Sequence, residues 1–197
     1  MKYTNINGWV WQSGLGKSTY FGTEAGSKDG GVNGGAVGNE NVGLGQSALE
    51  EYTLGDGGDG AIVAGQNTAV GTNSLKTLLT GISNTAVGYN SASLETIGNS
   101  NTVVGANSLN GGVSGADANT AVGTGSMTKD SATTDQQFSK NSSLGFKAIS
   151  ANDASVIANN VAIGFTAMSE NTDTVDGEME FMDYNVAIGY RAYSISE

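Results

Sequence analysis

The chain contains no cysteine, no proline and no histidine. Without cysteine it can form neither a disulfide nor a thiolate metal site. Without histidine it lacks the commonest general base and the commonest metal ligand. Hydrolysis would depend on carboxylates, lysine or tyrosine alone, and the placement of these residues selects no catalytic pair. The sequence therefore predicts a protein that is not an enzyme, with no catalytic residue, cofactor or metal site.

Basic residues are also scarce, with 8 Lys and Arg against 19 Asp and Glu and a formal net charge of −11. Binding to a phosphate backbone requires an array of Lys and Arg, so we expect no nucleic-acid partner. Residues Met1 to Asn5 begin no apolar run, and no stretch approaches the length of a membrane span. These features favour a protein that is made in a cytoplasm, is not exported by the usual route and has no membrane partner.

A short motif recurs along the chain. N-T-A-V-G occupies residues 67–71, 84–88 and 119–123, and N-T-V-V-G occupies residues 101–105. Weaker copies begin at residues 18, 41, 141, 160 and 185, which makes nine copies at intervals of 17 to 26 residues. A repeat of this kind indicates a quasi-linear stack of similar units in place of a globule with one central core.

The repeated unit is too short for most helical repeats, which exceed about 30 residues. Its β-branched residues, Gly and Asn favour short strands joined by turns. We therefore predict an all-β fold, a parallel β-roll or β-solenoid of about nine short coils. An Asn begins eight of the copies, where we expect it to occupy a turn and to stack its amide between coils: Asn41, Asn67, Asn84, Asn101, Asn119, Asn141, Asn160 and Asn185.

Alternation along each strand divides the unit into two faces. Thr85 and Val87 share one face, and Ala86 and Gly88 share the other. We expect the bulky face to fill the roll and the small face to lie against another backbone. A bare face and open sheet edges favour self-association, and we expect a homotrimer. The predicted trimer seam consists of Ala69, Ala86, Ala121, Ala162, Ala187, Gly71, Gly88, Gly105, Gly123, Gly164 and Gly189.

The unit N-x-A-(V/I)-G, as at residues 160–164 and 185–189, resembles the head repeat of trimeric autotransporter adhesins. Those heads are left-handed parallel β-rolls that assemble as trimers. The longer form N-T-A-V-G-x-N-S-L, as at residues 67–75, resembles repeats of bacteriophage tail fibres and related virion appendages. The resemblance extends over about residues 18–193 and implies a left-handed homotrimeric roll.

For function, the resemblance implies a structural virion protein on the exterior of a tailed phage: a short fibre, a spike or a capsid decoration. Its partners would be copies of itself and other virion proteins of the capsid or tail. The alternative is an adhesin or receptor-binding module that recognises a host surface glycan or protein through insertions in the repeat.

Two regions depart from the repeat. Residues 1–17 precede the β-roll domain of residues 18–197, and we expect them to cap the first coil or to dock the roll on a particle through Trp9, Val10 and Trp11. Insertions at residues 50–66, 128–140 and 169–184 lengthen single coils, and insertions in solenoids often carry binding. The last is either a rim loop packed on its neighbours or a partner contact through Met179, Phe181, Met182 and Tyr184.

Two other motifs carry weaker interpretations. The Thr column of residues 68, 85, 102 and 120 is compatible with ordering water, but Thr shares its face with Val, which favours a buried or half-buried column. Asp56-Gly57-Gly58-Asp59-Gly60 offers oxygen ligands for Ca²⁺. It occurs once, whereas calcium repeats need successive turns, so a Gly-rich loop is favoured.

Overall fold

The computed structural model describes residues 4–5, 9–12, 18–27, 40–50, 65–94, 98–110, 115–129, 137–151, 156–171 and 181–196. Every regular element in these ranges is a β-strand. The strands are β1 (Thr4–Asn5), β2 (Trp9–Gln12), β3 (Thr19–Phe21), β4 (Val42–Leu44), β5 (Thr68–Val70), β6 (Thr85–Val87), β7 (Thr102–Val104), β8 (Thr120–Val122), β9 (Met127–Lys129), β10 (Gln137–Ser139), β11 (Ser142–Leu144), β12 (Ile149–Ala151), β13 (Val156–Ala158), β14 (Val161–Ile163), β15 (Met168–Asn171), β16 (Phe181–Asp183), β17 (Val186–Ile188) and β18 (Tyr193–Ser196).

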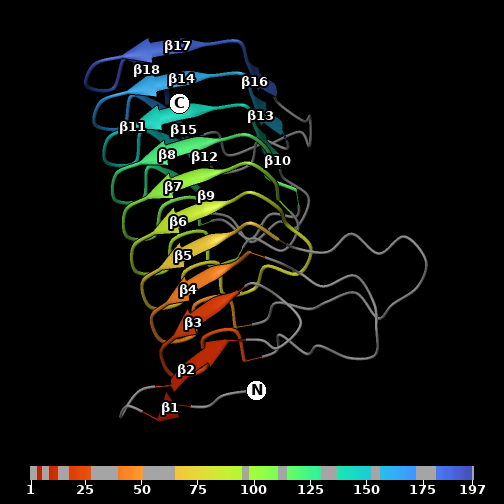
Figure 1. The fold of residues 1–197 in the computed structure, drawn as a ribbon. Helices are drawn as coiled ribbons and strands as arrows, with labels where there is room; N and C mark the ends of the chain where they lie inside the picture. The colour runs from red at the N-terminus through yellow and green to blue at the C-terminus, as the bar shows by residue number, and fades with distance from the viewer. Residues whose placement is uncertain are drawn as a thin grey trace, which may run out of the picture.

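The main feature of the fold is a long sheet with the strand order β1-β2-β3-β4-β5-β6-β7-β8-β11-β14-β17. From β3 to β17 neighbouring strands are parallel, and each comes from one copy of the motif. The register is strict, since Thr68 pairs with Thr85 and Ala69 pairs with Ala86. Figure 1 shows the strands stacked one above another with the chain coiling between them. The predicted parallel β-solenoid is confirmed.

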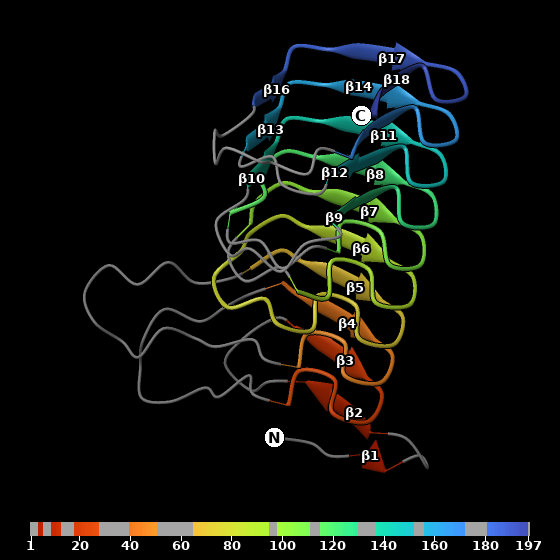
Figure 2. The ribbon, with the colours of Figure 1, turned by 180° about the vertical axis from the view of Figure 1, so that it is seen from behind.

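Two shorter sheets complete the later coils. One has the order β10-β13-β16 and the other has the order β18-β15-β12-β9, and both are parallel. Figure 2 shows them beside the long sheet in the upper part of the roll. Two predicted insertions, 128–140 and 169–184, therefore have strands at their ends, from β9 to β10 and from β15 to β16. Most of the third insertion, 50–66, lies outside the described residues.

The structure reverses the two faces expected from the sequence. Ala69 and Ala86 are fully buried inside the roll, whereas Thr85 and Val87 are half-buried on its outer side. The physical reason is the width of the roll. Long side chains from the opposite wall already fill the interior of the roll, so only a small residue fits across from them. The long side chains that are fully buried include Leu49, Leu75, Leu78, Met127, Ile149 and Met168.

The alanines of the predicted trimer seam consequently belong to the chain's own core. Ala69, Ala86, Ala121, Ala162 and Ala187 are at most 2% exposed. A second copy of the chain cannot contact side chains that the roll itself encloses. The prediction that the small face points outward is wrong, and any seam must use the other face of the strands.

Left-handed backbone at non-glycine residues is frequent in the turns, and it is least favourable at Thr166, whose φ is +44°. A β-branched residue tolerates this conformation poorly, and the buried Thr166 hydroxyl has no hydrogen-bond partner. The equivalent turn position in three other coils is Asn73, Asn90 or Asn107, each with φ between +52° and +56°. We expect Thr166→Asn to raise the free energy of unfolding by about 1 kcal/mol, measured by urea denaturation.

Thr102→Asn is the matched control, because Thr102 is an exposed residue within β7. Asn is disfavoured in strands, so this variant should be slightly less stable than the wild type. A gain at Thr102 as large as the gain at Thr166 would contradict the explanation from turn geometry.

Candidate interaction surface

A buried column of asparagine side chains holds successive coils in register. The backbone N–H of Asn119 donates to Asn101 Oδ1 at 3.0 Å, and Asn119 Nδ2 donates to the same oxygen at 3.0 Å. Asn119 Nδ2 also donates to the Phe138 carbonyl at 2.8 Å. Equivalent bonds link Asn67 to Asn84 and Asn84 to Asn101. This ladder satisfies the buried amides and allows no slip of one coil against the next.

A column of glycines sets how closely the coils approach. Gly88 has a φ of +138°, and a Cβ built on it would lie 2.5 Å from the carbonyl oxygen of Gly105, one coil further on. The same arrangement recurs from Gly22 to Gly164. The sequence predicted correctly that another backbone lies close to these glycines. That backbone is the next coil of the same chain. These glycines, which the sequence analysis assigned to the trimer seam, therefore set the spacing between the coils of one chain.

Because the coils are in register, the outward residues of the strands form straight columns along the roll. The third strand position carries an aliphatic or aromatic side chain in every coil: Phe21, Leu44, Val70, Val87, Val104, Val122, Leu144, Ile163 and Ile188. Exposure along this column reaches 51% at Leu144 and 66% at Ile188. The first strand position carries Thr19, Val42, Thr68, Thr85, Thr102, Thr120, Ser142, Val161 and Val186. We call these eighteen positions the outer face.

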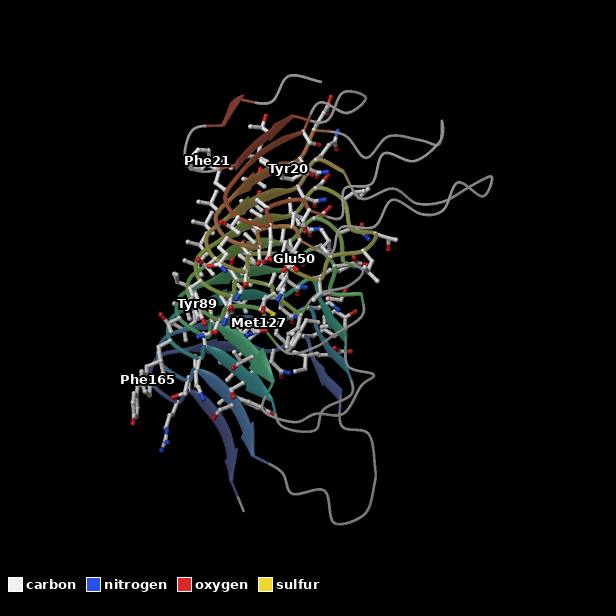
Figure 3. The ribbon with its side chains drawn as sticks, turned by 90° about the horizontal axis from the view of Figure 1, so that it is seen from below. Tyr20, Phe21, Glu50, Tyr89, Met127 and Phe165 are labelled. Carbon is white, nitrogen blue, oxygen red and sulfur yellow. The ribbon has the colours of Figure 1, made fainter. Side chains whose placement is uncertain are left out.

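An aromatic column borders the outer face in the later coils, just beyond the glycines. The ring centroids of Phe146 and Phe165 are 5.1 Å apart, and those of Phe165 and Tyr190 are 5.6 Å apart. The Arg191 guanidinium lies 5.8 Å from the Tyr190 ring centroid, within the range of a cation–π contact. Figure 3 shows Phe165 projecting from the roll, whereas Met127 lies toward its middle. The surface that borders the outer face therefore becomes aromatic toward β17.

The structure describes the other predicted site residues only in part. Trp9, Val10 and Trp11 lie in β2, which pairs antiparallel with β3, and their side chains are outside the described part. Met179 is also outside it, and Phe181 and Met182 are described only as backbone of β16. Tyr184 is 80% exposed.

The threonine column is more accessible than the sequence predicted. Thr68 and Thr85 are half-buried as expected, but Thr102 and Thr120 are exposed on the outer face. As predicted, they share that face with the valines.

Within the described ranges, no group of three or more Asp and Glu side chains is placed to hold a metal ion. The described residues also include no helix that is long and apolar enough to cross a membrane. The chain matches no protein-family model, no curated protein and no solved structure.

Proposed function

We propose that this chain is a structural protein that assembles with copies of itself, as a homotrimer, into a short fibre, spike or capsid decoration of a tailed phage. The outer face forms the contact between copies. The phage setting and the number three rest on the resemblance of the repeat to virion appendages and trimeric heads.

The composition of the outer face carries this proposal. The chain has 27 charged residues, 8 basic and 19 acidic, yet none occupies any of the eighteen outer-face positions. Exposed residues of soluble proteins are usually rich in charge, and the centres of protein interfaces are depleted of it. A continuous apolar column of this length on a monomer's surface marks an interaction site.

A second copy of the chain is the partner that fits this face best. The column repeats at the coil spacing along the whole roll, so an identical column can pack against it over many coils. Closed rotational symmetry then buries the face in every copy and leaves none open for further growth. All 27 charged residues of each copy then lie outside the buried outer face.

Light scattering coupled to size-exclusion chromatography tests the proposal. We expect the wild type to have three times the 19.9 kDa mass of the chain. The double variant Leu144→Lys, Ile163→Lys places two cations per copy in the seam, and we expect it to elute at the mass of one chain. Burial of unpaired charge at such a seam costs several kcal/mol, about 3 or more, which is enough to dissociate most assemblies.

Leu94→Lys is the matched control. Leu94 is 48% exposed but lies in the turn segment after β6, away from the outer face, so this variant should remain trimeric. Far-ultraviolet circular dichroism establishes that all three proteins are folded. A wild type at 19.9 kDa, or a folded double variant that remains trimeric, would contradict the proposal.

A further inference from the structure

The outer face has two borders, one at each end of its strands. Figure 1 shows the strands from β4 to β17 side by side and pointing the same way, so that their first residues form one line and their last residues form another. The residue before each Asn of the ladder forms the leading border, and the residue after each Gly of the glycine column forms the trailing border. The leading border consists of Glu40, Gln66, Ser83, Ser100, Ala118, Lys140, Asn159 and Tyr184. The trailing border consists of Gln46, Thr72, Tyr89, Ala106, Thr124, Phe146, Phe165 and Tyr190.

Closed rotational symmetry brings these two borders together. When copies surround one axis with the outer face turned inward, the leading border of each copy faces one neighbour and its trailing border faces the other. A rotation about that axis shifts no residue along it, so each coil meets the equivalent coil of the next roll when the rolls run parallel to the axis. The two borders of one chain must therefore be compatible with each other coil by coil.

The charges on the two borders meet this requirement. The sixteen border positions hold two charged residues, Glu40 and Lys140, although the chain has 27. In the coil of β4, the position opposite Glu40 is Gln46, whose side-chain amide is a donor that a carboxylate accepts. In the coil of β11, the position opposite Lys140 is Phe146. No coil from β4 to β17 therefore carries like charges on its two borders, which would repel each other in a ring of copies.

Lys140 and Phe146 are the most informative of these pairs. Lys140 is exposed, and no described carboxylate forms an ion pair with it. Phe146 is 44% exposed, and one face of its ring stacks on Phe165. The coil beneath carries Thr124 in that column, so the second face of the Phe146 ring has no ring against it. An ammonium group within about 6 Å of such a face is attracted by it.

The sizes of the border side chains are also compatible. Tyr89 is 55% exposed on the trailing border, and Figure 3 shows it on the same side of the roll as Phe165. The leading-border residue of its coil is the small Ser83. In the next coil both border residues are small, Ala106 and Ser100. Two borders with these side chains can approach closely without a clash between large groups.

We infer that, in the proposed homotrimer on which this inference rests, the leading border of each copy packs on the trailing border of the next copy, coil against equivalent coil. The Lys140 ammonium of one copy lies on the free face of the Phe146 ring of the next copy. The Tyr89 ring of one copy lies over Ser83 of its neighbour. The rolls are therefore parallel, with their first coils at the same end of the assembly.

Disulfide cross-linking tests this contact, and the chain has no cysteine of its own to interfere. The first variant carries Lys140→Cys and Phe146→Cys, and the second carries Ser83→Cys and Tyr89→Cys. Within one chain the two residues of each pair lie at opposite ends of one strand, about 15–20 Å apart, whereas a disulfide requires Cα atoms within about 7 Å. Copper–phenanthroline is the added oxidant that accepts the two electrons lost by the thiols. A disulfide can then form only between copies.

We expect both same-coil pairs to migrate as three linked chains on a denaturing gel without reductant, and as single chains after reduction. The matched control carries Ser83→Cys and Phe146→Cys, which lie on the same two borders but three coils, about 14 Å, apart along the roll. We expect no cross-link in this control. The second pair leaves Lys140 and Phe146 in place, so it remains decisive if the first pair weakens the assembly.

Light scattering of the reduced proteins separates this inference from the proposed function. If the proteins have the mass of three chains but neither same-coil pair cross-links, the border contact is overturned and the homotrimer stands. Equal cross-linking of the control pair overturns the coil-by-coil register. A wild type with the mass of one chain overturns the homotrimer and the border contact together.

Discussion

Gly88→Ala should destabilise the roll by about 4 kcal/mol or more. The added Cβ would lie 2.5 Å from the carbonyl oxygen of Gly105 and 2.7 Å from its carbonyl carbon. Backbone cannot rotate away as a side chain can, so β6 and β7 must separate and their hydrogen bonds must lengthen. The φ of +138° adds strain, because an L-residue rarely adopts it. Denaturation followed by circular dichroism gives the change in free energy of unfolding.

Gly189→Ala is the matched control for this prediction. Gly189 occupies the same position of the motif with a φ of +128°, but among the described residues no carbonyl oxygen of another coil lies within 4 Å of the position that its Cβ would take. It therefore measures the backbone strain alone, which we expect to cost about 1–2 kcal/mol. If the two substitutions cost the same, the close approach of successive coils does not explain the glycine column.

The asparagines and glycines made the architecture predictable from the sequence. Asn84 and Gly88 recur with constant spacing because one must hydrogen-bond to its equivalent and the other must lie against its equivalent. Both requirements act between adjacent coils, so each coil of the roll repeats the same local sequence. A parallel stack of short strands is the arrangement that meets them.

The orientation of the strands was not predictable in the same way. Alternation shows that Thr85 and Val87 share a face, but it does not show which face is inside. Larger residues are usually expected in the interior, since a sheet with one exposed face packs its apolar face on the core. The opposite wall decides the matter, because Leu75 and Leu109 follow the glycines at constant distance and already occupy the interior. Counting those residues as core would have placed the alanines correctly.

The short sheet of β10, β13 and β16 was also missed. Phe138 and Ile157 are buried in it and pair in register, yet no motif is shared by the segments that contain them. Each strand is three residues long and lies at the end of a stretch of variable length. Its position follows from the Asn column, since Asn119 and Asn141 donate to the carbonyls of Phe138 and Ile157. The sequence predicted the Asn column, but it did not predict which group would accept the second side-chain N–H of each Asn.

Asn119→Asp should lower the free energy of unfolding by about 3 kcal/mol or more at neutral pH. Asn119 is 1% exposed, and its Nδ2 donates to Asn101 Oδ1 and to the Phe138 carbonyl. Aspartate has nearly the same shape but no side-chain N–H. The Phe138 carbonyl therefore loses the hydrogen bond from Nδ2, Asn101 Oδ1 keeps only the bond from the Asn119 backbone N–H, and both oxygens face a buried carboxylate. We expect the loss in urea denaturation, and we expect β8 and β10 to lose hydrogen-exchange protection before the first coils do.

Asn107→Asp is the control with the same chemical change on the surface. Asn107 is exposed, and its Oδ1 accepts a hydrogen bond from Asn90 Nδ2 that aspartate retains. We expect a change within about 0.5 kcal/mol. Equal effects at the two positions would mean that the loss at Asn119 comes from added negative charge on an acidic chain. A large effect at Asn119 alone would show that paired amide donors hold the coils together, which explains why Asn occupies this position in eight of the nine copies of the motif.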